Sequence, residues 1–270
     1  MTSALQPGII HRRSIEGLSQ MEYFIYVPAT KPDSNKVLYT IHGISRNAEE
    51  HVQRFIGQAD RNGVTIVAPL FTKQHFPRYQ RLGKSAQLER ADMAFDHVLQ
   101  DVQKWLDVPP APMRLFGFSG GAQFVHRYAM FYPQRVRRMV LTAPGWYTFP
   151  DPNRKYPYGL KSTKEWPKLI FPLEDFLKIP TLVMVGEVDD LRDKDLNKVR
   201  EIDSFQGLNR IERAERWVNA NRNMARSYDV GADFQLETVV NASHAYESYM
   251  AHPPFSDQVF DFLFEDYKER

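Results

Sequence analysis

The stretch MRLFGFSGGAQFVHRY, residues 113–128, decides the fold of this chain. Its first six residues are mostly apolar and predict a buried strand. The strand ends in Gly-Phe-Ser-Gly-Gly at residues 117–121, and the apolar spacing that follows, at Phe124 and Tyr128, is typical of one helix face. The pattern G-x-S-x-G between a strand and a helix places Ser119 at the tip of a sharp turn.

The glycines beside Ser119 serve a steric purpose. A strand-to-helix turn this tight strains the backbone and crowds its neighbours, so residues without a Cβ fit there. The turn presents the serine hydroxyl, and it places the amide of Gly120 at a helix start, where it can face developing negative charge. The alternative interpretation is a glycine-rich turn with an incidental serine, and the order of other polar groups along the chain decides between the two.

The composition is that of a globular protein. The chain has 270 residues, of which 43% are hydrophobic and 25% charged, and this fits one large domain or two small ones. The net charge of +2 gives no indication of a nucleic acid or a membrane surface as partner. The absence of cysteine excludes a disulfide framework, thiolate zinc sites and a cysteine nucleophile. Because residues 1–14 hold no apolar core of signal-peptide length and no apolar run approaches about 18 residues, we expect a cytoplasmic protein without a membrane span.

Strands and helices are expected to alternate along the chain. The apolar patterns predict strands at residues 21–27, 36–41, 64–70, 113–118, 138–143, 180–186 and 234–240. They predict helices at residues 48–59, 85–106, 208–227 and 255–267, besides the one after Ser119. This order, with strands that are nearly continuously apolar, favours an α/β fold: a mostly parallel sheet with helices on both faces.

Residues 146–178 interrupt this alternation. They are rich in proline and aromatic residues and show no long helix or strand pattern. Since the segment is too short to bury a core of its own, we expect a single domain over residues 1–270 with this segment inserted as a lid. Residues 71–84 form a second polar and aromatic loop, and both segments are expected to overhang Ser119.

A serine nucleophile needs a base, and the base needs an orienting acid. In a parallel sheet such groups gather at the carboxyl ends of the strands. The strand at residues 180–186 is followed by Asp189, and the strand at residues 234–240 is followed by His244. The order Ser119, Asp189, His244 is the chain order expected of an α/β-hydrolase triad.

Neighbouring residues offer alternatives for two of these roles. Asp190 is the alternative acid, whereas Glu187 is interpreted as a carboxylate that anchors the loop. His252 is the alternative base. His126, in the helix after Ser119, is interpreted as a partly buried structural histidine.

With these residues identified, the chain resembles the α/β-hydrolase superfamily over essentially its whole length. The resemblance is carried by His42-Gly43, Gly117-Phe118-Ser119-Gly120-Gly121, Gly186-Glu187-Val188-Asp189 and His244. The sequence of the serine turn, followed by Ala122-Gln123, is similar to that of serine esterases of the polyhydroxybutyrate-depolymerase and feruloyl-esterase type. The resemblance implies hydrolysis of an ester or related acyl bond through an acyl-enzyme, and it leaves the substrate open.

Stabilising an oxyanion requires two donors. One is the amide of Gly120, and the other is expected from the loop after the second strand, where His42-Gly43 allows close backbone approach. The resemblance implies that the amide of Ile44 is the second oxyanion donor, and that the side chain of His42 braces this loop. The alternative is that Arg46 and Asn47 point into the site.

The two overhanging segments predict a substrate mouth. Trp146 and Tyr147 would supply apolar walls and Arg78 and Arg81 a cationic rim, suited to an ester that bears a carboxylate or phosphate. The alternative is a solvated basic loop over ordinary aromatic packing. No metal or cofactor is expected, because the metal, Walker and dinucleotide motifs are absent. Residues 193–197 begin like a calcium-binding loop, but the glycine at the sixth position and the glutamate at the twelfth position of such a loop are missing. Residues 193–197 are interpreted as a solvated surface loop.

These observations predict a serine hydrolase that cleaves a carboxylic ester on a Ser119–His244–Asp189 triad. Its partner would be a small-molecule ester, and the oligomeric state is left open. A serine peptidase or thioesterase on the same triad is the alternative within enzymes. A ligand receptor of the same fold without activity is the alternative outside them.

Overall fold

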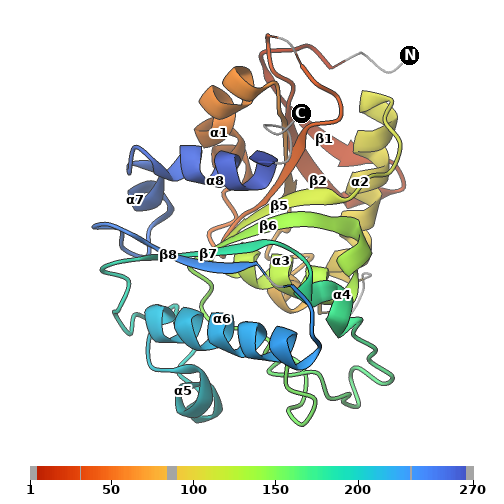
Figure 1. The fold of residues 1–270 in the computed structure, drawn as a ribbon. Helices are drawn as coiled ribbons and strands as arrows, with labels where there is room; N and C mark the ends of the chain where they lie inside the picture. Colours follow the sequence, from red (N-terminus) through yellow and green to blue (C-terminus); the bar gives the residue numbers. More distant parts are fainter. Residues whose placement is uncertain (1–4, 31, 84–89, 232, 266–270) are drawn as a thin grey trace.

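A single sheet of eight strands organises the part of the chain that the computed structural model describes, residues 5–30, 32–83, 90–231 and 233–265, without the side chain of Ser19. The strands lie in the order β1-β2-β4-β3-β5-β6-β7-β8. Their bounds are β1 (Ile10–Ile15), β2 (Leu18–Tyr26), β3 (Val37–Ile41), β4 (Thr65–Leu70), β5 (Met113–Phe118), β6 (Val136–Thr142), β7 (Thr181–Gly186) and β8 (Phe234–Val239). Figure 1 shows the strands twisting across the molecule.

The predicted mostly parallel sheet is confirmed. The β1–β2 and β2–β4 pairings are antiparallel, and the other five pairings are parallel. β1 was not predicted, because its sequence IHRRSI carries three basic residues and no apolar run. Its position explains this composition, since an edge strand tolerates charged side chains that a central strand would bury.

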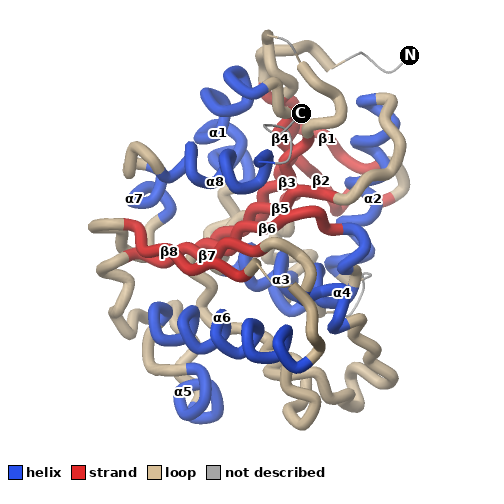
Figure 2. The backbone as a smooth tube through the Cα atoms, in the orientation of Figure 1, coloured by secondary structure: helices blue, strands red, loops and turns tan. Residues whose placement is uncertain are grey.

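Helices cover both faces of the sheet, as expected. They are α1 (Ala48–Asn62), α2 (Ala91–Leu106), α3 (Gly120–Phe131), α4 (Leu173–Leu177), α5 (Arg200–Gln206), α6 (Arg210–Ser227), α7 (Tyr246–Met250) and α8 (Phe255–Phe264), with 3-10 turns η1 (Tyr79–Arg81) and η2 (Pro133–Arg135). α1 and α8 pack on one face, and α2, α3 and α6 pack on the other (Figure 2). Each face therefore has its own apolar core.

The short helices are the main difference from the predicted pattern. α4, α5 and α7 have five, seven and five residues, so they contain too few turns to give a helical period. The helix expected from residue 85 begins at Ala91, where the preceding Arg90 is extended, and residues 85–89 lie outside the described residues. The predicted end of the last helix at residue 267 also lies outside them.

Residues 146–178 connect the carboxyl end of β6 to the amino end of β7. The rings of Tyr156, Trp166 and Phe171 pack around Phe131 at the end of α3, with centroid distances of 5.8, 5.6 and 4.7 Å. This part of the segment therefore packs against the end of α3. The segment's first residues, from Trp146, follow β6 directly at the carboxyl edge, and a lid role stays a prediction for them.

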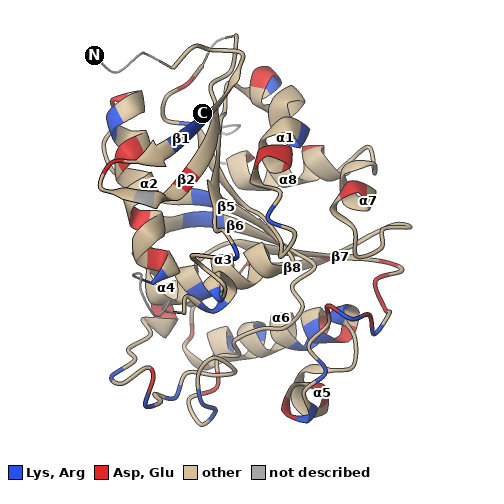
Figure 3. Cartoon of the chain, turned by 180° about the vertical axis from the view of Figure 1, so that it is seen from behind, with Lys and Arg blue, Asp and Glu red and all other residues tan. Residues whose placement is uncertain are grey.

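Basic and acidic residues are interspersed along the chain, which fits the small net charge (Figure 3). In the described residues, no helix is long and apolar enough to cross a membrane.

Candidate active site

Ser119 lies between β5 and α3 with a strained backbone. Its φ of 52° and ψ of −111° are uncommon for a residue with a side chain. The neighbouring glycines are required by close approach: a Cβ on Gly121 would lie 1.9 Å from the carbonyl oxygen of Ile41, and one on Gly117 would lie 2.6 Å from the amide of Ala122. The turn is held at the sheet, because the Ser119 amide donates to the carbonyl of Thr142 at 2.8 Å.

The three predicted triad side chains meet at the carboxyl edge of the sheet. Ser119 Oγ lies 3.0 Å from His244 Nε2, and His244 Nδ1 lies 2.9 Å from Asp189 Oδ2. An ionised carboxylate only accepts, so Nδ1 carries the proton that is donated to Asp189, and Nε2 is left to accept from the serine hydroxyl. This chain of hydrogen bonds is the arrangement in which a serine can be deprotonated.

The alternative residues lie elsewhere. Asp190 is exposed, whereas Asp189 is 1% exposed. Glu187 accepts a hydrogen bond from the Asn241 amide at 3.0 Å, which confirms its interpretation as a loop anchor. His126 is fully buried rather than partly buried, and it joins the carbonyl of Ala122 to the amide of Thr148.

A buried arginine behind the triad is a feature that the sequence interpretation missed. Arg210, the first residue of α6, donates from Nη1 to Asp189 Oδ1 at 3.0 Å. The same guanidinium donates to both oxygens of Asp193, at 2.8 and 3.2 Å. In the sequence, the only indication of this cluster is the close spacing of Asp189 and Asp193. Arg210 lies 21 residues after Asp189, so the sequence does not indicate that the two are in contact.

Asp193 corrects the interpretation of residues 193–197 as a solvated loop. Burial by itself would raise the pKa of Asp193, but the hydrogen bonds and charge of Arg210, with the amides of Asp195 and Leu196, lower this pKa to about 2. Asp193 is therefore an ionised structural anchor of the loop after β7. No cluster of three or more potential metal ligands occurs among the described residues.

The two predicted oxyanion donors are neighbours. Gly120 begins α3, so its amide has no acceptor within the helix. The amide nitrogen of Ile44 lies 3.5 Å from the point where a Cβ on Gly120 would stand. A side chain at residue 120 would also meet the Tyr79 hydroxyl at 2.7 Å, so the glycine keeps this space open. That the two amides bind an oxyanion stays a prediction.

His42 braces the loop that carries Ile44. The amide of Phe71 donates to His42 Nε2 at 3.0 Å, and Nδ1 donates to the carbonyl of Gly43 at 2.8 Å. The hydroxyl of Tyr79 donates to the His42 carbonyl at 2.8 Å. Burial lowers the pKa of His42 to about 4, so the ring is neutral and can accept from Phe71.

The fold has counterparts among solved structures. A poly(aspartic acid) hydrolase-1 from Sphingomonas sp. KT-1 matches 95% of this chain and 100% of its own length, with a TM-score of 0.80 and 25% identity. A poly(3-hydroxybutyrate) depolymerase from Bordetella parapertussis matches 91% of this chain and 84% of its own length, with a TM-score of 0.76 and 24% identity. An S-formylglutathione hydrolase from Agrobacterium tumefaciens has a TM-score of 0.59 and 16% identity, over 94% of each chain.

The chain is a member of the α/β-hydrolase superfamily. No protein-family model and no curated protein sequence matches it. The sheet order and the parallel pairing from β4 to β8 are those of this α/β-hydrolase fold. The expected fold class is thereby confirmed.

Arg46, the alternative residue for the site, and Arg78, predicted for the rim, are both engaged with protein groups in this α/β-hydrolase. The guanidinium of half-buried Arg46 donates to the carbonyls of Phe71 and Phe76. Arg78 forms an ion pair with Glu165 at 3.6 Å, with both side chains exposed. Arg46 therefore holds the aromatic loop together instead of pointing freely into the site.

The predicted aromatic walls separate into two environments. Trp146 lies under two guanidinium groups, those of Arg81 at 5.1 Å and Arg127 at 4.1 Å from its ring centroid. Tyr147 is completely buried and stacks on Trp217 at 4.9 Å. The structure therefore places Tyr147 in the core rather than on the wall of a mouth.

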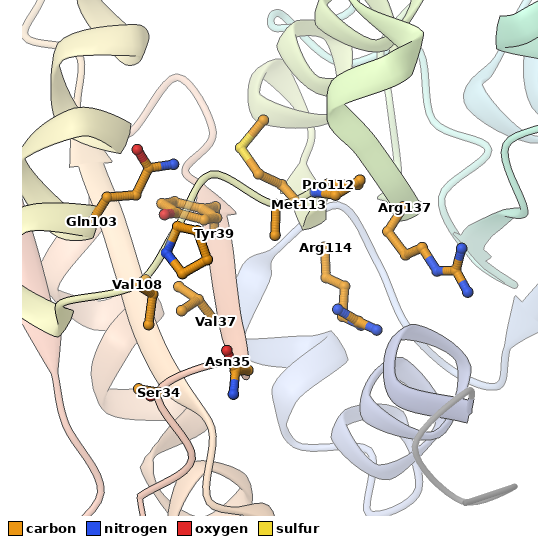
Figure 4. A pocket seen from close by; sticks show the side chains of 12 residues that line it. Ser34, Asn35, Val37, Tyr39, Gln103, Val108, Pro112, Met113, Arg114 and Arg137 are labelled. Carbon is orange, nitrogen blue, oxygen red and sulfur yellow. The ribbon is translucent and has the colours of Figure 1, made fainter.

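A cavity of about 390 Å³ lies at the other edge of the sheet (Figure 4). It is lined by residues near the amino ends of β3 and β5, including Asn35, Val37, Gln103, Met113 and Arg114. Ser119 follows the carboxyl end of β5, so the length of this strand separates it from the cavity. The candidate site of this α/β-hydrolase at Ser119 therefore lies away from the cavity.

Proposed function

We propose that this α/β-hydrolase cleaves a carboxylic ester through an acyl-enzyme on Ser119. The observation that carries the proposal is the unbroken chain of hydrogen bonds from Ser119 through His244 to Asp189, at a strained strand-to-helix turn. A ligand receptor would have no need of all three groups in this arrangement. The proteins of similar fold, a poly(aspartic acid) hydrolase, a poly(3-hydroxybutyrate) depolymerase and an S-formylglutathione hydrolase, support the same class of activity.

The geometry gives each group a role. Ser119 Oγ attacks the acyl carbon while His244 Nε2 takes its proton, and His244 returns that proton to the leaving alcohol. Asp189 keeps the proton of the neutral imidazole on Nδ1 and stabilises the imidazolium. A water activated by His244 then attacks the acyl-enzyme and releases the acid, which regenerates the serine. The amides of Ile44 and Gly120 would bind the oxyanion in both halves of the reaction.

Cleavage of an amide bond in an acidic polymer is a second candidate. It is favoured by the likeness to the poly(aspartic acid) hydrolase, which extends over 100% of that chain at a TM-score of 0.80. Arg78, which precedes η1, and Arg81, its last residue, provide exposed or partly exposed positive charge. The same triad would serve, with an amine in place of the alcohol as leaving group.

Covalent labelling tests the shared part of both candidates. We expect a fluorophosphonate probe to modify Ser119 and the Ser119→Ala variant to be inert, with Ser204→Ala, on α5, as a control that labels normally. Hydrolysis of p-nitrophenyl esters of increasing acyl length, measured beside release of amines from poly(aspartic acid), then separates ester from amide cleavage. Labelling of the Ser119→Ala variant, or none of the wild-type protein, would reject the proposal.

A further inference from the structure

The carboxylate of the triad acid is held from behind by a buried ion cluster. The side chains of Asp189 and Arg210 are each 1% exposed, whereas that of Asp193 is 29% exposed. Asp189 uses one oxygen for His244 and the other for Arg210. Arg210 in turn binds both oxygens of Asp193. The four side chains therefore form one continuous line from the imidazole to the surface.

The charges along this line pose a physical problem. A triad acid assists catalysis because its negative charge stabilises the imidazolium that forms when the serine is deprotonated. A buried arginine in contact with that carboxylate cancels much of its charge, and low surrounding polarity makes the cancellation stronger. Asp193 adds a second negative charge, bound to the same Nη1 of Arg210 that binds Asp189, and the net charge of the cluster is again −1. A guanidinium contact on Asp189 is thus compatible with its catalytic role.

We propose that Arg210 and Asp193 are positioning residues of the active site, Arg210 by orienting the Asp189 carboxylate and Asp193 by restoring the negative charge that the His244 imidazolium requires. The inference rests on the proposed serine hydrolase function. It assigns two separable roles: geometry to Arg210 and charge to Asp193.

Other ionisable groups around the cluster do not supply this charge. Tyr147, after β6, and Tyr249, on α7, face Asp189, and burial raises the pKa of both hydroxyls, so they are neutral. Arg213, on α6, interacts with Arg210 electrostatically, but it forms its own ion pair with Asp203 of α5 at 2.8 Å. Asp193 is therefore the carboxylate in contact with Arg210 besides the triad acid.

The test measures the rate at which the fluorophosphonate modifies Ser119 as a function of pH, because this reaction needs neutral His244 but no knowledge of the substrate. The rate rises with pH, and its midpoint reports protonation of the base. In Asp193→Asn the imidazolium loses stabilisation, so we expect the midpoint to move to lower pH by roughly half a unit. Asp193→Glu, which keeps the charge, should return it toward the wild-type value.

Arg210→Lys separates geometry from charge. The ammonium keeps the positive charge but not the fork that reaches two carboxylates, so we expect the plateau rate to fall about 10-fold without a shift of the midpoint. Asp195→Asn is the matched control, because Asp195 is exposed and lies in the same loop, and it should change neither quantity.

Two results would overturn the inference. One is an Asp193→Asn midpoint equal to that of wild type, which would make Asp193 a loop anchor alone. The other is an Arg210→Lys plateau equal to wild type, which would remove the orienting role. Failure of the wild-type protein to label at Ser119 is a different result, which would reject the proposed function and this inference with it.

Discussion

The two edges of the sheet differ in what they offer a substrate. The amino edge has a cavity of about 390 Å³, but no histidine or carboxylate is among its lining residues. The carboxyl edge has the strained Ser119, hydrogen-bonded to His244, and the buried Asp189–Arg210 pair. The comparison teaches that a hollow by itself does not locate chemistry. Strained backbone and buried charge cost folding free energy, so their position identifies the functional edge more reliably.

The largest effect should come from removing the nucleophile. Ser119→Ala is expected to lower kcat for ester hydrolysis by about 10⁴-fold or more, and His244→Ala to do the same without further loss in the double variant, because the residues act as a unit. The control at the amino edge is Ser34→Ala, which should leave kcat within about twofold of wild type. Loss of activity in Ser34→Ala with retention in Ser119→Ala would reverse the comparison of the edges.

Replacing the proposed triad acid tests which of two adjacent carboxylates at the carboxyl edge orients His244. Asp189→Asn should lower kcat by about 10⁴-fold, since an amide no longer holds the imidazole in the correct tautomer. The exposed Asp190→Asn should change kcat only a few-fold, and His252→Ala should be similarly mild. A greater loss in Asp190→Asn than in Asp189→Asn, measured on the same ester, would move the acid by one residue.

Acid should weaken the carboxyl edge through His42. Its pKa is about 4 in the folded protein and about 6.5 when unfolded, so its contribution to stability is complete above pH ~6.5 and is lost as pH falls toward 4. The loss for His42 is about 3 kcal/mol in the free energy of unfolding. Urea denaturation at pH 7 and pH 4.5 should show a smaller loss in His42→Gln than in wild type. His11→Gln, at a half-buried histidine of β1, is the control, and equal losses in all three proteins would contradict the prediction.

The smallest effect concerns the basic rim. Arg78 pairs with exposed Glu165, and Arg81 lies over buried Trp146. Their contribution to capture of an anionic ester should therefore be only a few-fold in kcat/KM and should weaken with salt. Arg78→Ala and Arg81→Ala should lower kcat/KM for an anionic ester more than for a matched neutral one. Arg137→Ala, at the amino edge, is the control. Parallel responses of both esters to salt would leave the rim without a role in substrate choice.

Local patterns in the sequence predicted much of the fold and the reactive groups. The apolar run from Met113 to Phe118 and the glycines around Ser119 identify the turn, because sterics at a tight turn are a local property. His244 and Asp189 were found because parallel strands bring their carboxyl ends to one edge. β1 escaped prediction because an edge strand needs no apolar run, and the short helices escaped because their periods are incomplete.

The contacts between distant segments were beyond the reach of local patterns. Arg210 lies 21 residues from Asp189, and only the packing of α6 onto the sheet brings its guanidinium to the acid. Tyr147 and Trp146 are adjacent aromatic residues, but one stacks on Trp217 in the core and the other lies under Arg81. Sequence spacing cannot distinguish them, because burial is decided by what packs on each side chain.

The sequence by itself indicated the alternation of strands and helices, the candidate nucleophile and the candidates for base and acid, since each depends on short-range sterics and on where strands end. Only the tertiary structure decided that Asp189 rather than exposed Asp190 meets His244, that His42 is a neutral brace and that Asp193 is bound to Arg210. The physical reason is that hydrogen bonds and buried charge depend on distances of a few ångströms between segments far apart in the chain, and these distances are set by packing of the whole core.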